Sequence, residues 1–281
     1  MNSTAVALRA GLARGMIEFR QSVTGPELLG HLLWPVATLV AVFFLRHRQF
    51  QHTGFKLGTL IMPSVLGMFT CFGAVLLIQQ LTAEREDGTL LRAKAVPNGI
   101  RGYFLGKLVT TSATIVGYLV ILMVPGLFMV TGLEAGRAGS WATFAWVLLL
   151  GLVATQSIGA MLGSLIASPR GAGYLSILVM GLISISGIFY PITALPGWLQ
   201  ATAQVFPIYW LGLGMRSALL PHSMAAVELG HSWRHLETLG VLGAWALVGV
   251  IVAPIVLSRM ARKESGSRVA ERRAKLLQRV G

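Results

Sequence analysis

Apolar residues recur along this chain in six long blocks that are separated by shorter polar segments. A helix that crosses a bilayer needs about 20 mainly apolar residues, and each block approaches or exceeds that length. The pattern therefore predicts an all-α membrane protein with six transmembrane helices. The predicted spans are residues 28–45, 57–80, 103–131, 142–167, 172–190 and 237–257.

The segment before the first span has the pattern of an amphipathic helix. On a helix formed by residues 5–23, Leu12 and Met16 lie on one face, whereas Arg14 and Glu18 lie on the other. Such a helix can lie in the membrane interface with its apolar face in the lipid. The alternative is a soluble helix packed on the same protein. We favour the interfacial position, because an apolar span follows closely.

Residues 191–236, before the last span, are too polar to cross the membrane twice. They contain prolines, which break helices, and tryptophans and tyrosines, which prefer the membrane interface. We therefore predict short, broken re-entrant helices that dip partway into the outer leaflet. Irregular backbone at that depth must be buried in protein or line a cavity. Our candidates for the re-entrant region and a substrate path are Tyr190, Pro191, Pro196, Trp198 and Pro207.

Positive charge is distributed unevenly between the two sides of the predicted membrane. With the N-terminus inside, 17 of the 23 lysines and arginines lie in inside segments and 6 lie outside. This split predicts that both termini are cytoplasmic. Topology thus accounts for the net charge of +13, and we expect no nucleic-acid partner. The chain divides into an amphipathic helix (1–27), a six-span domain (28–257) and a basic cytoplasmic tail (258–281).

The spans lack the groups that an energy-converting membrane protein needs. Lys107 and His31 lie near the starts of spans, and we expect Lys107 to extend its charged end to the interface. Proton-driven transporters need titratable groups at membrane depth. The P-loop pattern G-x-x-x-x-G-K-[ST], which cradles ATP phosphates, does not occur. We therefore expect that the chain is no enzyme and binds no cofactor itself.

Other polar residues point to structural roles. Gln156 lies in the middle of the fourth span, where an interhelical hydrogen bond is the favoured role and contact with a substrate is the alternative. His231 and His235 are four residues apart, but no glutamate stands beside His231 and no cysteine ligands accompany them. We expect surface histidines there and no metal site. Cys71, the single cysteine, is expected to be a core residue.

The most informative polar segment lies between the second and third spans. Three acids and an arginine are followed by a glycine and a threonine, and then by a short amphipathic stretch that a proline ends. This string resembles the cytoplasmic loop of ABC-2 type permeases, whose pattern is close to E-R-E-x-G-T-L, then a proline, then a G-K entering the next span. The matching residues are Glu84, Arg85, Glu86, Gly88, Thr89, Leu90, Pro97, Gly106 and Lys107.

The resemblance extends over nearly the whole chain, because the proline-rich region before the last span fits the same family. It is closest to the drug-resistance subgroup that resembles daunorubicin exporters. The resemblance implies a permease that moves a lipophilic or amphipathic substrate out across the bacterial cytoplasmic membrane. Its implied partners are membrane lipids, a second permease subunit (identical or not) and separate ATPase subunits that hold ATP and Mg. The loop of residues 84–97 would then be a coupling helix seated in an ATPase groove.

Two other classes of function remain open at this point. A non-transporting membrane scaffold or immunity component would bind an ATPase without moving a substrate, and vesicle uptake of substrate distinguishes it from an exporter. A stand-alone ion-coupled carrier or channel would work in vesicles without any ATPase subunit.

Overall fold

The structure is a computed structural model of the chain, and all the elements discussed below are helical. No β-strand occurs among the described residues, so the predicted all-α class is confirmed for them. The residues that the structure describes are 3–25, 27–49, 56–95, 99–166 and 168–263.

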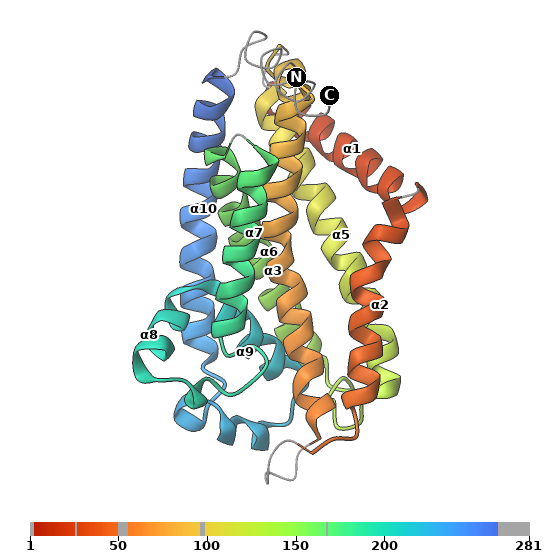
Figure 1. Ribbon diagram of the computed structural model, residues 1–281, viewed down its shortest axis with the longest axis vertical. Helices are drawn as coiled ribbons and strands as arrows, with labels where there is room; N and C mark the ends of the chain where they lie inside the picture. Colours follow the sequence, from red (N-terminus) through yellow and green to blue (C-terminus); the bar gives the residue numbers. More distant parts are fainter. Residues whose placement is uncertain (1–2, 26, 50–55, 96–98, 167, 264–281) are drawn as a thin grey trace.

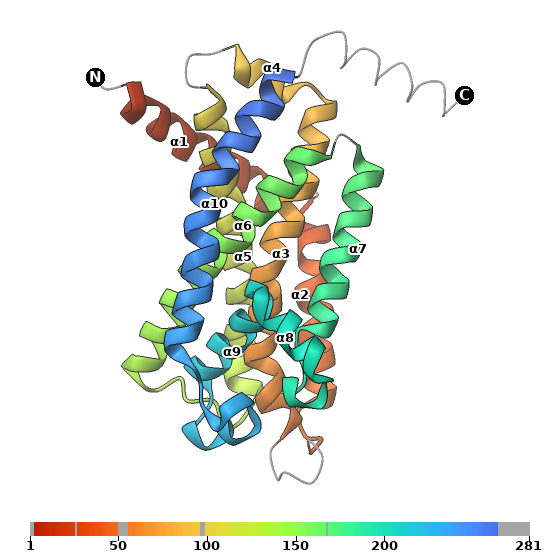
Figure 2. The same cartoon turned by 90° about the vertical axis from the view of Figure 1, so that its left-hand side faces the viewer.

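The long helices run side by side along the long axis of the molecule, and its two ends differ (Figure 1). Helix α1 (Ser3–Thr24) and the short helix α4 (Thr89–Lys94) lie at one end, as Figures 1 and 2 show together. Helices α8 (Gly197–Val205) and α9 (Pro207–Leu219) lie toward the other. We refer to these as the α1 end and the α9 end.

Five helices are long and apolar enough to cross a membrane. They correspond to the first four predicted spans and the last one, and α3 continues six residues beyond the predicted end. These helices are α2 (Glu27–Leu45), α3 (Leu57–Glu86), α5 (Gly99–Met129), α6 (Ala138–Leu165) and α10 (His235–Lys263).

The predicted fifth span is shorter than expected. Helix α7 (Pro169–Ile185) has 17 residues, so the prediction that it continues to residue 190 is wrong. The amide of Ser186 bonds to the carbonyl of Ile183, which tightens the last turn. Gly187 then takes a φ of +67°, a left-handed conformation that ends a helix. The count of six spans therefore stays a prediction.

Helix α3 is the central helix of the bundle. Of its most apolar window 78% is buried, compared with 11% for α2 and 22% for α10. Helices α5, α6, α7 and α9 pack against it, and small residues bring some of these backbones close together. A Cβ atom on Gly67, for example, would lie 3.1 Å from the backbone of Gly212 in α9. Helices α2 and α10 thus leave most of their apolar surface uncovered.

The proline-rich region forms short helices, as predicted. Pro207 begins α9, where its missing N–H costs no helical hydrogen bond. Nearly all residues of α9 are buried, because the helix packs among α3, α6 and α10. Its ends are therefore covered by protein, whereas its depth in a membrane stays a prediction.

Helix α1 packs on α5 through small and polar residues, and its apolar side chains face outward. A Cβ atom on Gly15 would lie 2.6 Å from the carbonyl oxygen of Gly106, so only glycine permits this approach of the two backbones. On the other side of the helix, Leu12 and Met16 are 52% and 58% exposed. This orientation argues against a soluble helix that buries its apolar face on the same protein.

Candidate functional site

The acidic run of the predicted coupling loop is the end of one helix, a turn and the start of the next. Residues 84–86 form the last turn of α3. Gly88 has a φ of +80°, which glycine adopts without a steric penalty. The Oδ1 atom of Asp87 accepts a hydrogen bond from the amide of Thr89 at 2.8 Å and so satisfies a free N–H of the first turn of α4.

Helix α4 is held to the bundle through its apolar face. Leu90 and Ala93 are buried in a cluster with residues of α3, α5, α6 and α10. At the end of α4, the Nζ atom of Lys94 donates to the carbonyl oxygen of Arg262 in α10 at 3.4 Å. A displacement of α4 would therefore act on the ends of several long helices at once. Pro97, the predicted stop of this helix, lies outside the described residues.

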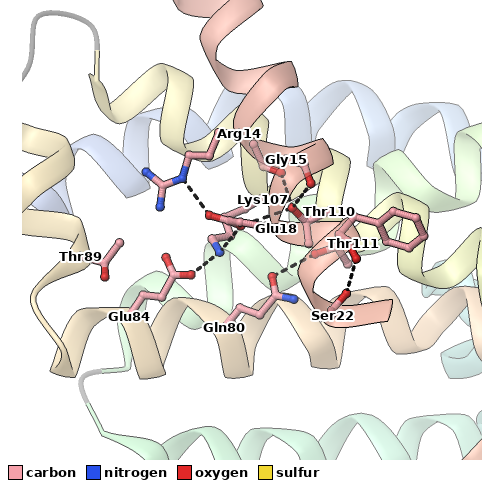
Figure 3. Close-up of polar contacts among 12 residues, drawn as sticks. Arg14, Gly15, Glu18, Ser22, Gln80, Glu84, Thr89, Lys107, Thr110 and Thr111 are labelled. Atoms are coloured by element: carbon pink, nitrogen blue, oxygen red, sulfur yellow. Dashed lines mark hydrogen bonds and ion pairs between the residues drawn. The ribbon is translucent and has the colours of Figure 1, made fainter. Parts of the chain in front are cut away.

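Lys107 of α5 is the centre of a polar network beneath α1 (Figure 3). Its side chain is only 5% exposed, and its Nζ atom pairs with Glu18 of α1 at 2.6 Å and with Glu84 of α3. The charged end of Lys107 is therefore enclosed by protein, and its depth in the membrane stays a prediction. A buried ammonium needs charged partners, and two other helices supply them. Lys107 thus joins α1, α3 and α5.

The α1 side of this network is reinforced by further hydrogen bonds. The Nε atom of Arg14 donates to Glu18 at 2.8 Å, and the hydroxyl of Thr110 donates to the carbonyl oxygen of Gly15 at 3.0 Å. Burial raises the pKa of Glu18, but hydrogen bonds from Lys107 and Arg14 outweigh it and lower the pKa below the ordinary 4.5. Glu18 is therefore ionised at neutral pH and holds α1 to the bundle.

The predicted coupling residues do not share one environment. Glu84 faces inward to Lys107, and the Nη1 atom of Arg85 donates to the carbonyl oxygen of Ile166 at 2.9 Å, at the end of α6. Glu86 is partly exposed and forms no hydrogen bond or ion pair with another described residue. Among these three, Glu86 is the one without such a contact in the described part of the chain.

A pocket of about 530 Å³ opens beside the network. Residues of α1, α2, α3, α4 and α5 line it, and all but Gly25 and Ala83 carry polar side chains. His31 of α2 lines one wall, and its Nδ1 atom lies 2.5 Å from the hydroxyl of Tyr118 in α5. Such a polar pocket is unusual in a chain with 12% charged residues.

Gln156 is buried in the middle of α6. Its Nε2 atom donates to the hydroxyl of Ser112 in α5 at 2.8 Å, an interhelical hydrogen bond of the kind that the sequence favoured. Its Oε1 atom has no partner among the described residues. Contact with a substrate stays a prediction.

The predicted re-entrant residues act locally as turn and capping residues. Pro191 and Pro196 precede a 3-10 turn and α8, and the hydroxyl of Tyr190 donates to a backbone carbonyl at 2.6 Å. Pro207 is buried at the start of α9, whereas Trp198 is exposed on α8. The network around Lys107 does not include them, and their place in a substrate path stays a prediction.

The α9 end contains a buried ion pair that the sequence interpretation missed. The Nε atom of Arg216 donates to Glu228 at 2.7 Å, and the two side chains are 2% and 1% exposed. The Nη1 atom of Arg216 also donates to the hydroxyl of Ser64 at 3.1 Å and to the carbonyl of Ile188 at 3.0 Å. A signal was present, because charged residues in a largely apolar segment tend to be paired when buried.

The histidines of the same end form no metal centre in the part of the chain that is described. No group of three or more His, Cys, Asp or Glu side chains there could hold a metal ion. The Nδ1 atom of His231 instead lies 2.7 Å from the carbonyl oxygen of Ala226.

Comparisons with known proteins identify a family and a relative. The family model described as ABC-2 type transporter matches residues 18–220, a range that includes Glu18, Lys107 and Arg216. The probable multidrug ABC transporter permease YbhR of Escherichia coli (strain K12) is 26% identical over 151 residues, and that of strain O157:H7 matches equally. The match covers 53% of this chain and 40% of the relative.

Proposed function

The chain belongs to the ABC-2 type transporter family, and we propose that it is the membrane subunit of an exporter driven by ATP hydrolysis on a separate ATPase chain. In this proposal ATP and Mg bind the partner, and this chain carries the substrate path. It is a transport subunit and not an enzyme.

The proposed topology places both termini and the α1 end on the cytoplasmic side of a bacterial cytoplasmic membrane. The excess of lysine and arginine in the segments at this end supports that orientation. Helix α7 serves as the fifth of six spans. Its 17 residues extend about 26 Å at 1.5 Å per residue, close to the hydrocarbon thickness of about 30 Å.

The observation that carries the proposal is the pairing of Lys107 with Glu18 and Glu84. Glu84 is two residues from Glu86, the proposed contact for the ATPase, and one turn before α4. A push of the ATPase on the turn at Glu86 and on α4 would reach α3 directly, and α5 and α1 through Lys107. The spans contain few ionisable groups, so this junction is where energy can enter.

The substrate is proposed to be lipophilic or amphipathic. Apolar spans with few polar side chains suit such a molecule, and the word multidrug in the relative's name supports the same class. A second permease subunit, identical or not, is proposed to cover part of the apolar surface that α2 and α10 leave exposed.

The test uses the full chain reconstituted in proteoliposomes with the ATPase that co-purifies with it. We expect Glu86→Ala to weaken ATPase binding, and Lys107→Met to leave binding intact but lower the uptake of an amphipathic dye per ATP hydrolysed. The control is Glu134→Ala, which removes a surface ion pair with Arg137 away from the junction. Dye uptake without any ATPase, or no difference between these variants and the control, would refute the proposal.

A further inference from the structure

We propose that the polar pocket between α1, α2, α3 and α5 binds the phosphate headgroup of a membrane phospholipid. The pocket lies at the α1 end of three apolar helices, beneath a helix with exposed apolar side chains. Figure 3 shows several of the polar residues that line it, among them Arg14, Gln80 and Lys107. Apolar spans end at the headgroup region of a bilayer, so we expect this end of α2, α3 and α5 to lie at that level. The assignment to the cytoplasmic leaflet rests on the proposed topology, whereas the binding itself does not.

Part of the pocket wall is made of buried polar side chains. Lys107, Thr110 and Thr114 line it and are each more than nine-tenths buried. The Lys107 ammonium is already paired with Glu18 and Glu84. One ammonium shared by two carboxylates leaves one negative charge, which the Arg14 guanidinium balances through its pair with Glu18. The remaining hydrogen-bonding groups then decide what the pocket takes.

Those remaining groups include several donors and one acceptor, the Oε2 atom of Glu84, which has no hydrogen-bond partner among the described residues. Arg14 uses its Nε atom for Glu18, and its two outer guanidinium nitrogens have no hydrogen-bond partner among the described residues. The carbonyl oxygen of the Gln80 side chain accepts from Thr111 at 3.2 Å, which leaves the amide nitrogen as a donor. A planar guanidinium with two free nitrogens matches the oxygens of a phosphate.

An apolar path favours a lipid over a free phosphate ion. Helix α5 runs from the pocket toward the α9 end, and its exposed face continues through Val116, Val120 and Val124. These residues are four apart and so lie on one side of the helix. Helix α2, which supplies His31 to the pocket, is likewise exposed along most of its length. A phosphate fixed at Arg14 would therefore direct its acyl chains along apolar protein surface.

The bound headgroup would also contact the junction that holds α1. Arg14 pairs with Glu18, and Glu18 pairs with Lys107. A phosphate on the outer nitrogens of Arg14 would order that side chain and thereby strengthen the attachment of α1 to α5.

The experiment measures lipid binding to the purified full chain in detergent by native mass spectrometry, without an ATPase. The probes are dioleoyl phosphatidylglycerol, dioleoylglycerol, which has the same chains without phosphate, and glycerol 3-phosphate, which has no chains. We expect one phosphatidylglycerol per chain, held about tenfold more tightly than dioleoylglycerol. Glycerol 3-phosphate should bind more weakly than the lipid.

Two variants of pocket residues and one control test whether the lipid binds in this pocket. Arg14→Gln should lower phosphatidylglycerol affinity about tenfold, and Gln80→Leu should lower it less, about threefold. The control Arg137→Gln removes an exposed arginine outside the pocket and should have no effect. Because Gln80→Leu leaves the pairs of Lys107 intact, unchanged hydrogen exchange of α1 in this variant separates loss of the site from loss of α1 docking.

Three results would overturn the proposal. Equal retention of phosphatidylglycerol and dioleoylglycerol would show that phosphate is not recognised. Equal affinity for glycerol 3-phosphate and the lipid would assign the pocket to a soluble phosphate compound. Equal binding by Arg14→Gln, Gln80→Leu and Arg137→Gln would place the lipid elsewhere. None of these results bears on whether an ATPase drives transport, so the two proposals fail separately.

Discussion

The two ends of the bundle each bury a basic side chain, and the two side chains are held in different ways. At the α1 end, Lys107 is shared between two carboxylates whose side chains are 23% and 18% exposed, beside a polar pocket. At the α9 end, Arg216 pairs with one carboxylate that is 1% exposed, and it also bonds to α3 and to the chain after α7.

We call the pairs of Lys107 with Glu18 and Glu84 the joint, because they can move. We call the bonds of Arg216 the anchor, because they are fixed. Lysine is a point charge on a flexible stem, so Lys107 can keep one carboxylate while the other moves. The planar guanidinium of Arg216 instead fixes the directions of its hydrogen bonds, and both members of the ion pair are almost fully buried. We therefore expect motion at the α1 end and rigidity around α9.

The largest effect is expected when the anchor is broken. Arg216→Met leaves the Glu228 carboxylate buried without its partner, and we expect a loss of about 3–5 kcal/mol in the free energy of unfolding. Thermal unfolding of the purified chain measures the change. The double variant Arg216→Met with Glu228→Leu should regain most of it. An unchanged midpoint in the single variant would contradict the anchor role.

Breaking the joint should cost less and act more locally. Lys107→Met leaves two partly buried carboxylates without their shared partner, and we expect a loss of about 2 kcal/mol. Hydrogen exchange should increase in α1 and at the end of α3, while α9 keeps its protection. Lys107→Arg is the charge-conserving control. Uniform loss of protection throughout the bundle would show that the two ends are not separate.

Steric separation of α1 from α5 tests the joint without changing any charge. Gly15→Ala places a methyl group 2.6 Å from the carbonyl oxygen of Gly106, and we expect about 1 kcal/mol of overpacking. Limited proteolysis should then cleave α1 faster. The matched control is Gly30→Ala in α2, where no heavy atom lies within 4 Å of the added carbon. Equal cleavage of both variants would contradict the close packing.

Acid should produce the smallest effect, and only at the α1 end. The pKa of Glu18 is below 4.5 in the folded chain, so its contribution to α1 docking is present above pH 4.5 and is lost as the pH falls through the folded value. Hydrogen exchange of α1, corrected for its intrinsic pH dependence, should be constant from about pH 6 to 8 and rise in acid. Glu18→Gln should remove this dependence. A loss of α1 protection above pH 6 would contradict it.

Much of the helical architecture was predictable because a membrane imposes a simple length requirement on apolar segments. The limits of α2 and α6 lie within a few residues of those predicted. The end of α7 was not predictable, since residues 186–190 are apolar enough to continue a span. The break depends on the left-handed backbone of Gly187. The coupling loop was recognised from its string of residues, but the inward direction of Glu84 was not.

What the sequence determined by itself was the class of this protein: the apolar lengths and the loop from Glu84 to Pro97 indicate a membrane permease. Tertiary structure alone decided which polar groups meet. Glu18 and Lys107 are far apart along the chain, as are Ser64 and Arg216, and local spacing carries no information about such contacts. Buried charges require partners, but only the packing of the helices selects the partner.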